Sequence, residues 1–382
     1  MAIQFTSDLP STQVLNAFNN NVVSFKSNSG TTSLDATITV GSVPVTITPD
    51  SDGLFTYNFI EIFKTIINSN HFKDGIYTDG AVPHPGDYLF TDVNVYKDLT
   101  VQYTITLEDG NTETTSRSYR VLRSVVQLED YRRNLTNVGN SSIALLSPFT
   151  QNSSKTNYAT MFDGYPFDLA IYSNNFQNVV FKNKTTGYEI IVALRRGVNR
   201  FFLSNGISNV TLDDDFPITL GVNEIEVYPM GSASTKSTLF LNKKESCSGH
   251  LLKWYNDFGG WCYFLFNENM LNKKVKDLGE FTSDFKNMKD TKDDFTSLGY
   301  SNEKMTQLFA EHLDSNEKKY INTLFGSPKV YLYLNEPFQK AGDKDFVPVK
   351  VDTSKVEDNF RYFKYADFFF EIYRPIINTM TM

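Results

Sequence analysis

The chain has 382 residues, of which 40% are hydrophobic and 21% charged, and its formal net charge at pH 7 is -8. This length suits two or three domains that each bury a core, and the composition excludes disordered and collagen-like proteins. No apolar run reaches the roughly 18 residues of a membrane-spanning helix, and residues 1–13 lack the pattern of a secretory signal. An acidic chain without a Lys/Arg block is a poor ligand for nucleic acid. We therefore expect a soluble globular protein with neither a membrane nor a nucleic-acid partner.

The residues that bind metals or catalyse reactions are sparse. The two cysteines, Cys247 and Cys262, are too few for a disulfide framework and are interpreted as thiols. A zinc site would use both with His250, but a fourth ligand and paired Cys-x2-Cys spacing are absent. The acidic run 213–215 is interpreted as a solvated turn, because a metal or glycosidase site needs partners that it lacks. No phosphate loop or hydrolase motif is found. We expect no metal, no cofactor and no enzymatic activity.

Residues 1–128 predict a β-sandwich with a short helical insert. Period-two alternation in 37–40 and 43–48 predicts one hairpin. A second hairpin begins with the nine alternating residues 99–107 and turns at Asp109-Gly110. Between the hairpins, apolar residues of 57–67 follow three-and-four spacing, which predicts one short helix.

Residues 129–245 predict a second sandwich. Short strands recur at roughly ten-residue spacing and are bounded by Asn, Gly or Pro, as in immunoglobulin-like domains; they cover 168–172, 179–182, 188–194 and 224–228. The basic, aromatic segment Tyr131-Arg132-Arg133 is predicted to be a linker or a subunit contact, because two arginine pairs do not form a phosphate-binding stripe.

Residues 246–382 predict an α+β domain. The pattern around Asn256-Asp257-Phe258-Gly259-Gly260 predicts a wide aromatic hairpin. Helical spacing predicts two short helices over 302–313 and 315–324, with Ser301 and Ser315 at their N-termini. Alternation in 329–334, 346–351 and 368–373 predicts strands, and the charged stretch 273–294 predicts a mobile loop or an exposed arm. The predicted fold class is mainly β: tandem immunoglobulin-like β-sandwich modules with a C-terminal α+β domain.

The third block resembles a family of virion proteins. Its residues 251–260, followed by an aromatic strand to Phe266 and by 327–333 and 346–351, are similar to neck, ring and tail proteins of tailed phages of Bacteroidetes, crAss-like phages included. The resemblance implies a structural subunit of the virion, assembled in the cytoplasm of the bacterial host. Its partners would be copies of itself in a ring of twelve or a divisor of twelve around the portal-tail axis, and neighbouring portal, neck or tail proteins. The family carries no catalytic residues over to this chain.

Four aromatic residues of the hairpin are the main interface candidates. Tryptophan and tyrosine dominate interface energetics, which nominates Trp254, Tyr255, Phe258 and Trp261 beside the linker candidates Tyr131, Arg132 and Arg133. The same four aromatic side chains equally fit the core of the third block. In a second hypothesis the chain is a glycan-binding adhesin or a receptor-binding module of a tail that stacks sugar on Trp254 or Trp261. A glycan depolymerase would need two carboxylates facing a groove, and no such pair is nominated.

Overall fold

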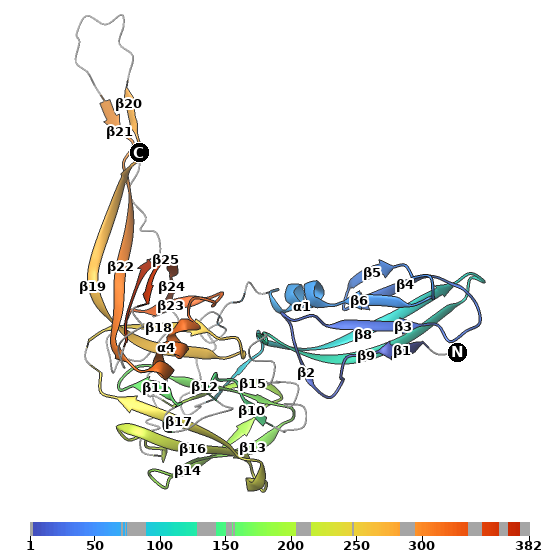
Figure 1. Ribbon diagram of the computed structural model, residues 1–382, viewed down its shortest axis with the longest axis horizontal. Helices are drawn as coiled ribbons and strands as arrows, with labels where there is room; N and C mark the ends of the chain where they lie inside the picture. Colours follow the sequence, from blue (N-terminus) through green and yellow to red (C-terminus); the bar gives the residue numbers. More distant parts are fainter. Residues whose placement is uncertain are drawn as a thin grey trace, which may run out of the picture. The chain divides into compact units, whose positions relative to one another are not determined.

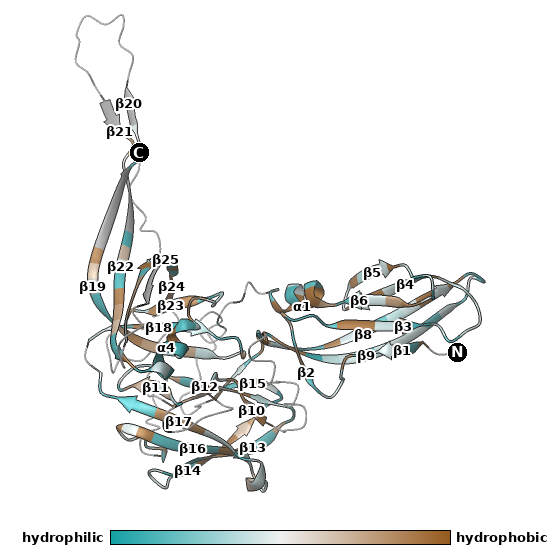
Figure 2. Cartoon of the chain, viewed as in Figure 1, coloured by the Kyte–Doolittle hydropathy of each residue, from teal (hydrophilic) through white to brown (hydrophobic). Residues whose placement is uncertain are grey.

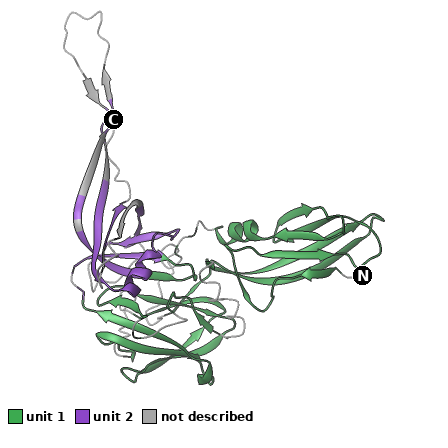
Figure 3. Ribbon diagram, in the orientation of Figure 1, with its two compact units in different colours: residues 1–245, 255–262, 338–343 green, residues 246–254, 263–337, 344–382 purple. Residues whose placement is uncertain are grey.

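The computed structural model describes residues 3–69, 72, 74, 89–127, 143–149, 155, 157–203, 215–246, 248–282, 295–334, 346–358 and 366–374. The fold is mainly β, with tandem β-sandwich modules and a C-terminal α+β domain (Figure 1). Two compact units are present (Figure 3). Unit 1 holds Met1–Glu245, Tyr255–Cys262 and Phe338–Asp343, and unit 2 holds the remainder. The predicted division into three blocks stays a prediction.

The N-terminal sandwich packs two antiparallel-rich sheets around an aromatic core. Both predicted hairpins are confirmed, and Gly110 supplies the positive φ of 79° at the second turn. The rings of Phe25 and Tyr103 meet edge to face at 5.0 Å, and Phe25 stacks on Phe55. One sheet has the order β1-β3-β6 and comprises β1 (Gln4–Ser7), β3 (Val22–Lys26) and β6 (Phe55–Asn58). The other has the order β2-β9-β8-β4-β5 and comprises β2 (Val14–Asn16), β4 (Ser33–Val40), β5 (Val43–Ile47), β8 (Tyr96–Leu107) and β9 (Thr112–Leu122).

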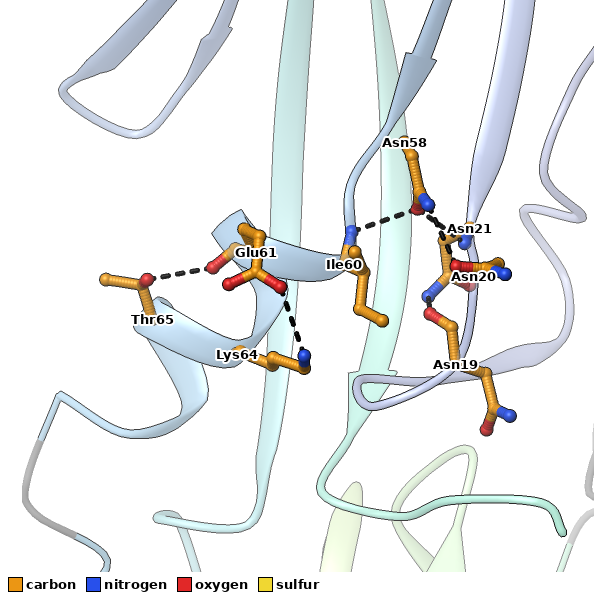
Figure 4. Close-up of polar contacts among 8 residues, drawn as sticks. All are labelled: Asn19, Asn20, Asn21, Asn58, Ile60, Glu61, Lys64 and Thr65. Carbon is orange, nitrogen blue, oxygen red and sulfur yellow. Dashed lines mark hydrogen bonds and ion pairs between the residues drawn. The ribbon is translucent and has the colours of Figure 1, made fainter.

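Helix α1 (Ile60–Ile67) confirms the predicted insert and buries Ile62, Phe63 and Ile67. Figure 2 shows that the helix carries both hydrophilic and hydrophobic residues. An asparagine cluster fixes its start (Figure 4): the Asn58 side-chain oxygen accepts hydrogen bonds from the backbone N–H groups of Ile60 and Asn21. Since the residue before the helix, Phe59, has no capping side chain, Asn58 takes part of that role.

The second sandwich also has two sheets. The first, in the order β10-β12-β15-β7, comprises β7 (Leu89–Asp92), β10 (Ile143–Leu145), β12 (Asp168–Ser173) and β15 (Gly197–Phe202). The second, in the order β11-β17-β16-β13-β14, comprises β11 (Ala159–Phe162), β13 (Gln177–Asn183), β14 (Glu189–Leu194), β16 (Gly221–Pro229) and β17 (Ser237–Lys244), with the 3-10 helix η3 (Ala233–Thr235) between the last two. The four predicted strands are confirmed.

Strand β7 comes from the first predicted block but pairs with β15 in the second sandwich, with Asp92 opposite Val198. Phe181 and Phe201 join the facing sheets at a ring distance of 4.3 Å. The second sandwich is therefore completed by a strand that precedes it in the chain by about fifty residues, a pairing that local alternation does not encode.

Unit 2 is built on a seven-stranded sheet in the order β24-β23-β18-β19-β22-β26-β25. The aromatic hairpin is confirmed as β18 and β19. The sheet comprises β18 (His250–Tyr255), β19 (Trp261–Asp277), β22 (Tyr300–Leu313), β23 (Val330–Tyr333), β24 (Phe346–Pro348), β25 (Lys350–Asp358) and β26 (Ala366–Tyr373). The helix α4 (Ser315–Asn322) confirms the second predicted helix, but its N-cap is Asp314 instead of Ser315, because the Asp314 side chain accepts from the N–H groups of Asn316 and Glu317.

The helix predicted over 302–313 is wrong, since this segment is strand β22. Its apolar residues lie on both faces of the strand: Leu308 is fully buried, while the half-buried Phe309 stacks on Phe369 of β26 at 5.8 Å. Short apolar runs satisfy helical and strand spacing alike, and here pairing with β19 and β26 decides between them.

The charged stretch 273–294 begins as strand rather than loop. Its first residues continue β19 and then form β20 (Glu280–Thr282), which pairs with β21 (Phe295–Ser297) at the far end of the β19–β22 ribbon (Figure 1). Residues 283–294 lie outside the described residues.

Candidate functional site

The tip of the aromatic hairpin, residues 255–262, is the centre of the candidate site and belongs to unit 1 (Figure 3). Asn256 shapes the turn, because its side-chain oxygen accepts from the N–H groups of Phe258 at 2.8 Å and Gly260 at 3.2 Å. Gly259 has a φ of 97°, which other residues rarely adopt. The sequence Asn-Asp-Phe-Gly-Gly therefore specifies this turn locally.

The tip lies against one end of each sandwich. A Cβ at Gly260 would be 2.3 Å from the carbonyl oxygen of Leu146, so only glycine fits there. On the other side, the carbonyl of Asp257 accepts from the N–H of Val125 at 2.9 Å, just beyond β9. The hairpin tip thus joins the two sandwiches of unit 1, and we call this contact the joint.

Two of the nominated aromatic residues fill the joint. Tyr255 and Trp261 are 4% and 6% exposed, and their rings meet edge to face at 5.2 Å. Trp261 stacks on Phe72 at 5.9 Å, and the Tyr255 hydroxyl donates to the carbonyl oxygen of Arg123 at 2.9 Å. The guanidinium of Arg123 lies 3.5 Å from the centre of the Phe72 ring. These aromatic residues hold the joint together from inside.

A buried charge cluster lies beside the aromatic residues. Arg200 of β15 binds Asp168 of β12 in a two-point pair, with Nε to Oδ2 at 2.7 Å and Nη2 to Oδ1 at 3.0 Å. Its Nη1 donates to Asp74 at 2.6 Å, and all three side chains are at most 2% exposed. The guanidinium centre lies 5.7 Å from the Trp261 ring. The cluster therefore ties β12, β15 and the Asp74 segment to the hairpin tip.

Asp92, at the end of β7, is a third buried carboxyl near Arg200. Burial raises its pKa to about 6, and the charges of Asp74 and Asp168 act in the same direction, while Arg200 and the hydrogen bond from the Asn94 N–H oppose the rise. Burial also lowers the pKa of Arg123 to about 10. The joint thus holds more acidic than basic groups away from water.

The Arg200 guanidinium is directed at two carboxylates and is closed off from solvent. Among the described residues, no group of three or more His, Cys, Asp or Glu side chains could hold a metal ion. The described part of the chain also contains no helix long and apolar enough to cross a membrane.

The interface residues nominated from the sequence do not lie together in the structure. Trp254 lies in the core of unit 2, where its Nε1 donates to Thr323 at 2.8 Å and its ring packs on Tyr320 of α4. Trp254, Tyr255 and Trp261 are buried within the chain, in keeping with the alternative that these aromatic residues fill a core, while Phe258 is half-buried. Trp254 packs among residues of unit 2, whereas Tyr255 and Trp261 pack among residues of unit 1. Neither tryptophan is exposed for stacking on sugar, and Tyr131, Arg132 and Arg133 lie outside the described residues.

The residues considered for zinc have other surroundings. His250 pairs with Glu268 across neighbouring strands, and Cys262 is buried beside the Asn256 amide at 3.4 Å. Cys247 lies outside the described residues.

Sequence reasoning missed the charge cluster. Its members Asp74, Asp92, Asp168 and Arg200 are widely spaced in the chain, so no motif unites them. One local signal was present: Arg200 stands inside Val198-Asn199-Arg200-Phe201-Phe202, and a cation within a buried strand requires a carboxylate partner.

Comparisons with protein families and with curated proteins find no match. Among solved structures, fibronectin(III)-like modules of Clostridium thermocellum CbhA show 12% identity over 64% of this chain and 94% of theirs, with a TM-score of 0.20. A tetra-tandem repeat from the extending region of a large adhesion protein shows 13% identity over 63% of this chain and 47% of its own, with a TM-score of 0.22. A Ca2+-stabilised adhesin with which an Antarctic bacterium binds ice shows 9% identity over 81% and 69%, with a TM-score of 0.19. Similarity of this extent carries no argument about function.

Proposed function

We propose that the chain is a structural subunit of a tailed-phage particle, a ring, collar or tail component that assembles around the portal-tail axis. The joint is the observation that carries the proposal. Its aromatic residues and its charge cluster hold the two sandwiches in one arrangement. Among the described residues of the joint, no charged group is directed at a substrate.

Fixation of this kind suits a subunit whose surfaces must meet neighbours at a defined angle. A buried ion pair adds little net stability, because removing both charges from water offsets their attraction. It does favour one geometry, since any shift of Arg200 away from Asp168 and Asp74 leaves buried charges unpaired. The chain then presents its modules to copies of itself and to portal, neck or tail proteins, without a catalytic role.

Incorporation into particles tests this function. Immunogold labelling of purified particles should place the chain at the neck or tail. The variant Gly260→Ala, which distorts the joint, should be depleted from particles relative to Gly30→Ala, whose added methyl group meets open space.

Two results contradict the proposal. The first is a chain absent from particles that is retained, as a monomer, on bacterial surface polysaccharide, which is the outcome expected of a glycan-binding adhesin. The second is turnover of that polysaccharide by the purified chain, which is the outcome expected of a depolymerase.

A further inference from the structure

Among the described residues, strand β14 is an open edge of the second sandwich. It is the last strand of the sheet β11-β17-β16-β13-β14, and it pairs with β13 over six consecutive residues without a bulge, from Gln177 opposite Leu194 to Lys182 opposite Glu189. A regular edge strand exposes a row of backbone donors and acceptors on which another strand can pair.

The hydrogen-bond pattern shows which backbone groups point outward. The N–H of Asn183 donates to the carbonyl of Tyr188, so these two residues form a hydrogen-bonded pair. Such pairs alternate along an antiparallel ladder. Residues 190, 192 and 194 therefore bond to β13, and the backbone groups of Glu189, Ile191 and Ala193 face the open side.

The strand lacks lysine, proline and a bulge, three of the features by which natural edge strands resist pairing. Its sequence Glu-Ile-Ile-Val-Ala-Leu contains neither lysine nor proline, whereas the edge strand β5 of the N-terminal sandwich carries Pro44. Ile191 is 52% exposed. On the outer face of the sheet, Ile191 lies opposite Val180 of β13, and Val180 lies opposite Tyr228 of β16. The three side chains form an apolar row across the three strands.

The charges on β14 favour a second copy of the same strand as the partner. Glu189, the first residue of β14, and Arg195, the residue directly after its end, are both exposed. In an antiparallel pair of two β14 strands with the two-fold axis at Val192, Glu189 lies opposite Arg195 of the other copy, twice. The same register puts Ile191 opposite Ala193 and joins the outward backbone groups of these two residues as hydrogen-bonded pairs.

We propose that two copies of this chain associate through β14, in a two-fold antiparallel contact that makes one continuous sheet from two second sandwiches. The contact is self-complementary, as a two-fold interface must be. Apolar side chains lie at its centre and charged pairs at its rim. It goes beyond the particle subunit proposed above and does not depend on it, since a pair through β14 is compatible with either a free or a particle-bound chain.

Sedimentation equilibrium of the full chain over a concentration series tests the contact. Wild-type protein should show a monomer–dimer step, and Ile191→Lys, which places two lysines at the centre of the contact, should raise the dimer Kd by at least about tenfold. The matched control is Val43→Lys on edge strand β5, an equally exposed apolar residue, and it should leave the Kd unchanged.

A charge exchange tests the register. Glu189→Arg and Arg195→Glu should each weaken the pair by placing like charges opposite each other, and the double variant should restore the wild-type Kd. If the chain forms larger closed assemblies, Ile191→Lys should halve their mass. A wild-type chain that remains monomeric, an Ile191→Lys variant that associates as wild type does, or a double variant without rescue overturns the proposal.

Discussion

Arg200 is a cation in the middle of a buried strand, and its removal should be costly. In Arg200→Met, the carboxylates of Asp74 and Asp168 stay buried without their partner, which should lower the free energy of unfolding by about 3–5 kcal/mol. The control Arg196→Met removes an exposed arginine that pairs with Asp98 at the surface, and it should cost less than about 1 kcal/mol. Urea unfolding followed by tryptophan fluorescence measures both. Equal losses would contradict the assigned role of Arg200.

Asp92 should make stability depend on pH. Folding raises its pKa from 3.8 to about 6, so between these values the folded chain holds a proton that the unfolded chain releases. The free energy of unfolding therefore falls as pH rises through this window, by at most about 1.4 kcal/mol per pH unit. Asp92→Asn keeps an acceptor for the Asn94 N–H and has no charge to bury.

This variant should match the wild type near pH 4 and exceed its stability at pH 7 by up to about 3 kcal/mol. Urea unfolding of both proteins between pH 4 and pH 7 measures the difference, and carboxyl groups elsewhere in the chain cancel in the comparison. If the free energies of unfolding of the two proteins changed with pH in parallel, Asp92 would not titrate in this way.

At the scale of elements, the hairpin tip makes a prediction about packing. Gly260→Ala forces a methyl group against the carbonyl of Leu146 and the side chain of Ala170, which should lower the free energy of unfolding by about 2–3 kcal/mol. Gly30→Ala is the control, because nothing lies within 4 Å of its added Cβ. Thermal unfolding by circular dichroism compares the two. A Gly260→Ala variant as stable as the control would mean that the tip does not pack against Leu146.

Elements with strong local signals could be predicted from the sequence, and those fixed by distant partners could not. Asp109-Gly110 and the alternation of β8 specify a hairpin within about twenty residues. Strand β22 differs, because its apolar residues fit a helix equally well and only its pairing with β19 and β26 makes it a strand. In the same way, no local feature of β7 indicates that it completes a sheet with β15.

At the scale of the whole molecule, modular β-sandwich architecture follows from regular strand spacing and turn residues. The joint does not, because its charge cluster brings together Asp92, Asp168 and Arg200 from three strands of one sheet and Asp74 from outside that sheet, at positions far apart in the chain. The sequence left open whether Trp254 and Trp261 belong to an interface or to a core, and the structure buries both within the chain. Composition therefore indicates how much aromatic surface must be buried. Only the tertiary contacts show whether the chain itself or a partner buries it.

The central claim is that this chain works by associating with other protein chains. Native mass spectrometry of the full-length protein, from low micromolar concentration upward, tests it most directly. We expect species at integer multiples of the 43.5 kDa chain, with a discrete largest assembly. A single species at 43.5 kDa at every concentration, including in the presence of purified particle components, would contradict the account.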